Sequence, residues 1–144
     1  MKNLSFLLCM LFSITTFSQV WEKDFQSAQD LASKENKHII LVFSGSDWCA
    51  PCIRLDKKVW QSKDFRDYAA NHWVLYKADF PRKKANQLPE DITRKNKELA
   101  DKYNPQGMLP LVFILNKDGE VIGKTGFKNI SAKEYVEVLK AFEG

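Results

Sequence analysis

The sequence is poor in the side chains that bind structural metal ions, with three cysteines and two histidines among 144 residues. A structural zinc site needs about four such ligands in close groups. Only Cys49 and Cys52 form a close pair, whereas His38 and His72 are isolated in the sequence. We therefore expect neither a metal nor any other cofactor.

Long hydrophobic runs, internal repeats and low-complexity tracts are also missing. No stretch approaches the roughly 20 apolar residues that a membrane-spanning helix requires. The net charge of +4 is too small to indicate nucleic-acid binding. These absences predict one folded domain, which we expect to be a monomer that binds no nucleic acid.

Residues 1–18 have the composition of a secretory signal peptide. Lys2 is their one charged residue, an apolar centre runs from Leu4 to Ile14, and Thr16 and Ser18 occupy the −3 and −1 positions of a cleavage site. Cys9 does not follow the small residue expected before a lipid-modified cysteine, so a lipid anchor is the weaker alternative. We expect residues 19–144 to form a single domain that is periplasmic or secreted.

The stretch from Ser44 to Cys52 carries the predicted chemistry. It follows the apolar run Ile39–Phe43, which predicts a strand buried on both faces, and it leads into helix-compatible residues as far as Trp60. Cys49 and Cys52 are therefore expected at the start of a helix, close enough to form a reversible disulfide.

The positions of the two thiols predict different roles. A thiolate at Cys49 would face the unpaired N–H groups and the positive dipole end of the helix, which lowers its pKa below the free-thiol value of about 8.5. Cys49 is therefore the expected nucleophile, and Cys52 is expected to resolve the mixed disulfide. Pro51 suits the first helical turn, where no N–H is needed. A purely structural bridge is the alternative, although closing so short a loop constrains the unfolded chain little.

The remaining sequence alternates between helical and strand patterns. The predicted helices cover residues 22–37, 53–60, 62–69, 92–103 and 131–142, and the predicted strands residues 38–44, 73–80, 111–115 and 120–126. A capping box of Ser131 and Glu134 opens the last helix, which is expected to bury Tyr135, Val138, Leu139 and Phe142. This order predicts an α/β fold, with helices on both faces of a central mixed β-sheet.

Residues Phe80–Asp91 interrupt this pattern with charged residues and two prolines. Such a run most simply forms a solvated surface loop. A basic patch that binds a partner is the alternative.

These motifs resemble the thioredoxin superfamily, and most of all its secreted bacterial members. The resemblance rests on Trp48-Cys49-Ala50-Pro51-Cys52 after a buried strand, Met108-Leu109-Pro110 before another, the turn Asn116–Gly119, Gly126 and the closing helix. It implies a thioredoxin-like fold with an extra N-terminal helix, in which Pro110 is cis and faces the cysteines. It further implies that Trp48, Ala50, Pro51, Leu109 and Pro110 support the site or contact the substrate.

One feature departs from the family pattern. Phe43 stands where thioredoxin has a buried acid on its central strand, and the lysine that accompanies this acid falls on Leu75. Replacing both members of a buried ion pair by apolar residues is energetically reasonable. Because the acid helps to remove the proton of the resolving cysteine in the family, we expect Cys52 to react more slowly here, or through water.

The sequence thus predicts an extracytoplasmic thiol–disulfide oxidoreductase with Cys49 and Cys52 as its catalytic residues. We expect it to reduce disulfide-containing client proteins and to be recharged by a membrane electron donor. Oxidase or isomerase activity would use the same residues. The alternative from another class is a binding module with a mainly structural disulfide, in which the groove beside Pro110 holds a client protein.

Overall fold

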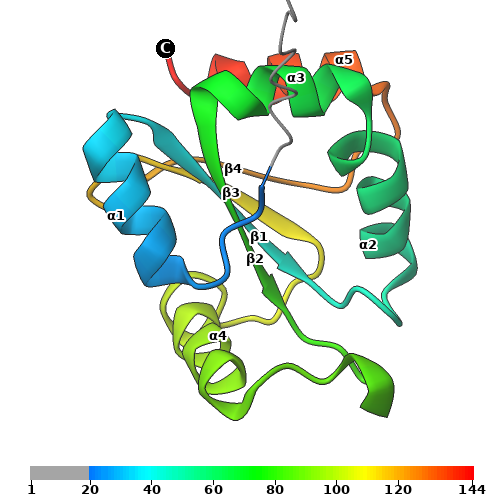
Figure 1. The fold of residues 1–144 in the computed structure, drawn as a ribbon. Helices are drawn as coiled ribbons and strands as arrows, with labels where there is room; N and C mark the ends of the chain where they lie inside the picture. Colours follow the sequence, from blue (N-terminus) through cyan, green and yellow to red (C-terminus); the bar gives the residue numbers. More distant parts are fainter. Residues whose placement is uncertain (1–19) are drawn as a thin grey trace, which may run out of the picture.

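A central sheet organises the computed structural model, which describes residues 20–144; the predicted signal peptide lies outside the described residues. Four strands follow one another across the sheet in the order β2-β1-β3-β4 (Figure 1). They are β1 (His38–Ser44), β2 (Trp73–Asp79), β3 (Leu111–Leu115) and β4 (Val121–Gly126). β1 pairs with β2 in parallel and with β3 antiparallel, and β3 and β4 form the predicted hairpin. The prediction of a mixed sheet is confirmed.

Helices cover both faces of the sheet, as predicted (Figure 1). α1 (Phe25–Glu35) and α4 (Glu90–Tyr103) cover one face, and α2 (Ala50–Leu55), α3 (Lys63–His72) and α5 (Ala132–Ala141) cover the other. A π-helical turn, η1 (Asp56–Trp60), continues α2, and a 3-10 turn, η2 (Lys84–Asn86), precedes α4. Successive strand residues point to opposite faces, so Ile40 and Val42 pack with α2, α3 and α5, whereas Leu41 and Phe43 pack with α1 and α4.

The last helix, α5, begins as its sequence predicts but buries a slightly different face. Ser131 and Glu134 form the capping box, in which each side chain accepts a hydrogen bond from the backbone of the other residue. Val136, rather than the predicted Val138, is buried beside Tyr135. The apolar face of α5 is wide enough to include both Val136 and Val138, and packing against the sheet buries Val136.

The site is positioned by the ends of three strands. β1 is buried from Ile39 to Ser44. Because β1 and β2 are parallel and β3 is antiparallel to β1, the carboxyl ends of β1 and β2 and the start of β3 meet at one edge of the sheet. The loops that leave Ser44, leave Asp79 and enter Leu111 therefore lie together. Within residues 20–144, no helix has the length and apolarity needed to cross a bilayer.

Candidate active site

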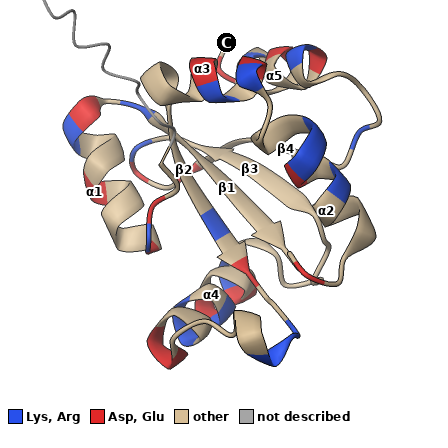
Figure 2. Ribbon diagram, turned by 45° about the vertical axis from the view of Figure 1, so that its right-hand side comes forward, with Lys and Arg blue, Asp and Glu red and all other residues tan. Residues whose placement is uncertain are grey.

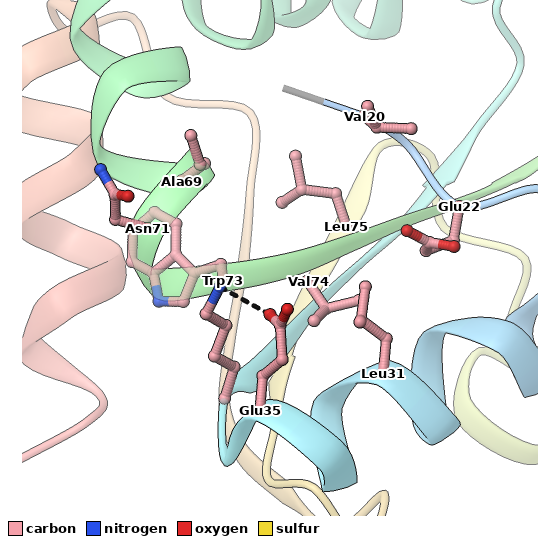
Figure 3. Close-up of a pocket in the computed structure, with 11 residues that line it drawn as sticks. Val20, Glu22, Leu31, Glu35, Ala69, Asn71, Trp73, Val74 and Leu75 are labelled. Atoms are coloured by element: carbon pink, nitrogen blue, oxygen red, sulfur yellow. Dashed lines mark ion pairs between the residues drawn. The ribbon is translucent and has the colours of Figure 1, made fainter. Parts of the chain in front are cut away.

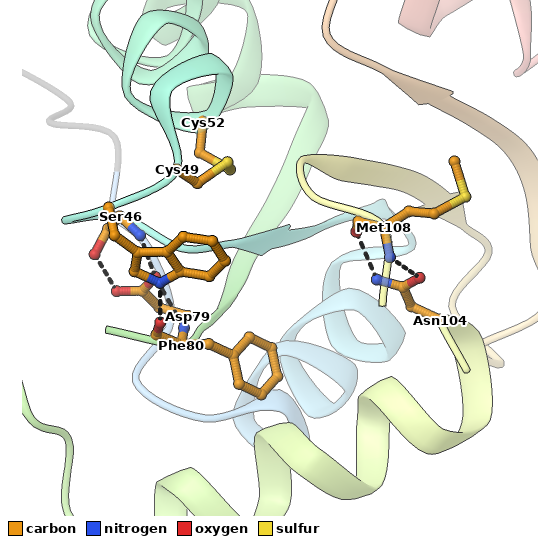
Figure 4. Close-up of a disulfide and its surroundings, with 8 residues drawn as sticks. Ser46, Cys49, Cys52, Asp79, Phe80, Asn104 and Met108 are labelled. Atoms are coloured by element: carbon orange, nitrogen blue, oxygen red, sulfur yellow. Dashed lines mark hydrogen bonds between the residues drawn. A yellow bond between two sulfur atoms is a disulfide. The ribbon is translucent and has the colours of Figure 1, made fainter. Parts of the chain in front are cut away.

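Cys49 and Cys52 are joined by a disulfide at this edge of the sheet (Figure 4). Their Cα atoms are 5.2 Å apart. Cys49 is the N-cap residue of α2, and Pro51 lies in the first turn of this helix, as predicted. Cys49 keeps 7% of its surface exposed and Cys52 keeps 3%, so the first cysteine is the more accessible of the two.

Trp48 lies across the loop that carries the cysteines. The carbonyl of Gly45 accepts hydrogen bonds from the backbone N–H groups of Trp48 and Cys49, at 3.2 and 2.9 Å. A Cβ atom on Gly45 would lie 2.5 Å from the Trp48 indole, so a side chain there would displace the ring. The indole Nε1–H donates to the carbonyl of Phe80 at 2.8 Å. Trp48 is thus held in place while 38% of its surface stays exposed.

The segment before β3 lies across from the disulfide (Figure 4). The Leu109–Pro110 peptide bond is cis, as the resemblance implies. Asn104 is buried and bonds to the Met108 backbone twice: its Nδ2 donates to the carbonyl at 2.7 Å, and its Oδ1 accepts from the N–H at 3.0 Å. Met108 itself is 53% exposed. Sequence reasoning missed Asn104, although its place just before Pro105 signalled a fixed turn.

A cavity of about 220 Å³ adjoins Cys52. Its lining residues are Ser44, Ser46, Cys52, Ile53, Asp56, Lys57 and Lys77. Lys77 on β2 donates to Oδ1 of Asp56 at 3.0 Å, and Gln61 donates to Oδ2 of the same carboxylate. Both members of this ion pair are partly buried, with 24% and 34% of their side chains exposed. Cys52, which the sequence predicts to be the resolving cysteine, therefore shares a cavity with the ion pair of Asp56 and Lys77.

The ion pair corrects one prediction made from the resemblance. Phe43 is buried and packs edge-on against Phe113, so this position holds no acid. Leu75 does not lie beside Phe43. In the parallel register of β1 and β2, Leu75 pairs with Ile40, and Phe43 pairs with Ala78. The lysine near the cysteines is instead Lys77, and its acid comes from η1 rather than from the central strand.

The loop with the cysteines is fastened to the residues after β2 through the carboxylate of Asp47. This carboxylate accepts hydrogen bonds from the backbone N–H groups of Arg82 and Lys83, both at 2.9 Å, and from Nδ2 of Asn86 at 3.1 Å. The bond from the Arg82 N–H is the main cause that holds the pKa of Asp47 below its ordinary value. The predicted surface excursion is largely exposed, but it is anchored to the active-site loop.

Two further contacts join the same segments. Asp79 accepts from the backbone N–H of Ser46 at 2.9 Å and also from its hydroxyl (Figure 4). The Arg82 guanidinium lies 3.5 Å from the centre of the Trp48 ring, a cation–π contact. A basic side chain is therefore held directly beside the residue that precedes Cys49.

Another cavity, of about 280 Å³, lies at the opposite end of β2 (Figure 3). It is lined by Val20, Glu22, Leu31, Glu35, Lys37, Ala69, Ala70, Asn71, Trp73, Val74 and Leu75. Its charged pair, Lys37 and Glu35 at 2.7 Å, is a surface ion pair, and no thiol lines the cavity. Within residues 20–144, no group of three His, Cys, Asp or Glu side chains could hold a metal ion. The chemistry of the described residues is therefore concentrated at the disulfide.

Comparisons with known proteins agree with this site. Residues 25–143 match the thioredoxin-like domain family. Among curated proteins, the disulfide bond reductase DsbH of Chlamydia pneumoniae is 35% identical over 121 residues, which are 84% of this chain and 70% of that protein. The thioredoxin-related protein DsbJ of Chlamydia pneumoniae is 25% identical over 112 residues, and the match covers 78% of this chain but only 32% of DsbJ.

Solved structures agree with the observed topology. A structure of a DsbH oxidoreductase superposes with a TM-score of 0.80 at 30% identity, covering 87% of this chain and 84% of that one. A thioredoxin from Thermus thermophilus superposes with a TM-score of 0.63 at 17% identity, covering 85% and 86% of the two chains, which shows the shared fold alone.

The fold is thus that of thioredoxin, with a cysteine pair at the end of its central strand. The chain belongs to the thioredoxin-like family, and it is a thiol–disulfide oxidoreductase.

Proposed function

We propose that this protein reduces disulfides of exported client proteins in the extracytoplasmic space. The observation that carries the proposal is the disulfide between Cys49 and Cys52 at a helix start, next to the exposed Trp48 and across from the segment of the exposed Met108. The name of the relative DsbH, a disulfide bond reductase, supports the reducing direction. The signal-peptide pattern of residues 1–18 supports the location.

The reaction begins with the dithiol form. The Cys49 thiolate attacks one sulfur of the client disulfide; the client S–S bond breaks, a Cys49–client bond forms, and the leaving sulfur takes up a proton. Cys52 then loses its proton and attacks Cys49 Sγ. The Cys49–client bond breaks, the Cys49–Cys52 disulfide forms, and the second client sulfur leaves as a thiolate that takes up a proton. Two electrons pass from the protein to the client. A membrane-bound dithiol donor restores the reduced pair by the reverse exchange.

The residues around the cysteines have three further roles: binding the client, supporting the helix start and accepting a proton. The exposed faces of Trp48 and Met108, with the half-buried Leu109, form the surface that receives an extended client segment, and the buried cis Pro110 shapes it. Ala50 and Pro51 hold the first turn of the helix. Asp56 shares the cavity with Cys52, and we assign to it the acceptance of the Cys52 proton through a water molecule in that cavity, in place of the family's strand acid.

A turnover assay tests this proposal. The reduced mature protein should cleave the disulfides of insulin catalytically with dithiothreitol as the final reductant, and the Cys49→Ser variant should be inactive. If the wild type has no activity, or if both proteins have the same activity, the disulfide is structural and the chain is a binding module. A titration of the pair against glutathione gives the reduction potential, and a potential well above that of glutathione would indicate an oxidase instead.

A further inference from the structure

The segment Pro81–Leu88 is basic and lies at the rim of the active site. It contains Arg82, Lys83 and Lys84 and no acidic residue, and Figure 2 shows basic residues on the turn that precedes α4. Within residues 20–144, none of the three forms an ion pair. Their charge is therefore available to a binding partner.

The basic segment Pro81–Leu88 makes contacts with the active-site loop that an ordinary solvent-exposed loop does not need. Its backbone is fixed by the Asp47 carboxylate through two N–H groups, and Arg82 stacks on Trp48 at 3.5 Å. The rim carboxylates Asp47 and Asp79 accept hydrogen bonds from backbone N–H groups and the Ser46 hydroxyl. Lys83 attracts Asp47 through space, but neither carboxylate forms an ion pair with the three cations. A solvated loop needs no such attachment, whereas a docking site needs its charges in a fixed place.

We propose that this basic segment docks acidic stretches of client proteins, so that disulfides flanked by Asp or Glu are preferred substrates. The inference rests on the proposed function, because the segment acts by placing the client at Cys49. Cations on a segment anchored at the rim of the active site raise the local concentration of anionic chains and their association rate. The effect therefore belongs to the association step and is screened by salt.

Matched peptide substrates test the proposal. Two synthetic peptides carry one intramolecular disulfide in the same loop, flanked by glutamates in one and by glutamines in the other. The second-order rate of reduction by the reduced protein is measured at about 20 mM and 500 mM NaCl, conditions of weak and strong screening. Each rate is divided by the rate with dithiothreitol, which removes the intrinsic difference between the peptides.

We expect the wild type to prefer the acidic peptide about tenfold at low salt and by less than about twofold at high salt. In the variant Arg82→Gln/Lys83→Gln/Lys84→Gln, the ratio of the acidic-peptide rate to the neutral-peptide rate should fall to about one. A control with the same net charge, Lys34→Gln/Lys63→Gln/Lys117→Gln, changes exposed lysines elsewhere and should keep the preference.

A third variant separates the placement of the charges from their number. Asp47→Ala keeps all three cations and makes the protein more positive, but it removes the acceptor that holds the backbone of Arg82 and Lys83. The preference for the acidic peptide should decrease if placement matters, and an increase would overturn the proposal. Equal rates for both peptides with the wild type at low salt would also overturn it and leave the proposed function intact. If neither peptide is reduced, the proposed function fails and this inference fails with it.

Discussion

Cys49 and Cys52 are joined by a disulfide, but the residues around the two sulfur atoms are very different. Next to Cys49 is the exposed Trp48, on which Arg82 of the basic segment stacks, and the exposed Met108 lies on the segment across from the disulfide (Figure 4). Cys52 is more deeply buried and borders a cavity that contains the ion pair of Asp56 and Lys77. The Cys49 side is suited to receive a client chain, and the Cys52 side is suited to move a proton. Substitutions on each side should therefore affect different steps.

The largest difference should come from the cysteines themselves. Cys52→Ser removes the resolving thiol, so turnover should fall by on the order of 10³ or more and the client should stay bound to Cys49 as a mixed disulfide. Non-reducing gels and mass spectrometry would detect the adduct. The single variant Cys49→Ser, which keeps Cys52, should give none, and an adduct through Cys52 in that control would contradict the assigned roles.

A smaller effect is expected from Asp56→Asn. The variant removes the carboxylate beside Cys52, so release of the client from the mixed disulfide should slow by about 10- to 100-fold, whereas the first attack by Cys49 keeps its rate. Single-turnover kinetics resolve the two phases. The rate of the slow phase, which is the release of the client, should rise only at higher pH than in the wild type. Asp67→Asn, an exposed acid on α3, is the matched control. An unchanged second phase in Asp56→Asn would remove the proton-accepting role.

On the Cys49 side, Asn104→Ala tests the support of the segment before Pro110. The variant leaves the N–H and carbonyl of Met108 without their partner, so the free energy of unfolding should decrease by about 1–3 kcal/mol. Urea denaturation measures the change, and Asn129→Ala, which removes a surface contact to Lys58, should cost less than about 0.5 kcal/mol. Equal losses in both variants would show that Asn104 has no special role.

The smallest effect concerns pH. Because the pKa of Asp47 is lowered in the folded protein, the attachment of the basic segment is complete above the ordinary aspartate pKa of about 3.9 and is lost as the pH falls through the lowered value. The amide NMR signals of Arg82 and Lys83 should therefore stay constant from about pH 7 to 5 and shift only below about pH 4. Asp47→Asn should abolish this transition. A transition centred above pH 5 would contradict the assignment.

Much of the fold was predictable because its signals are local. The apolar run Ile39–Phe43 gave a buried strand, and the capping box at Ser131 gave the start of α5. The motif from Trp48 to Cys52 located the site, because three-residue spacing at a helix start brings the thiols together. These features depend on neighbouring residues alone.

The features that were missed depend on long-range geometry. Lys77 meets Asp56 only through the parallel register of β1 and β2 together with the direction of α2 and η1, and the analogy with thioredoxin pointed to Leu75 instead. Asp47 binds backbone N–H groups that lie 35 and 36 residues later. Backbone donors leave no pattern of side chains in the sequence, so this attachment could not be read from it.

The most direct test of the division of labour between the cysteines is alkylation of the reduced protein over a range of pH. Limiting iodoacetamide and mass spectrometry of the separated peptides give the rate for each thiol. Cys49 should react with a midpoint well below the free-thiol value of about 8.5, and Cys52 with a midpoint clearly above that of Cys49. Equal midpoints, or a lower midpoint for Cys52, would contradict the assignment of Cys49 as the nucleophile.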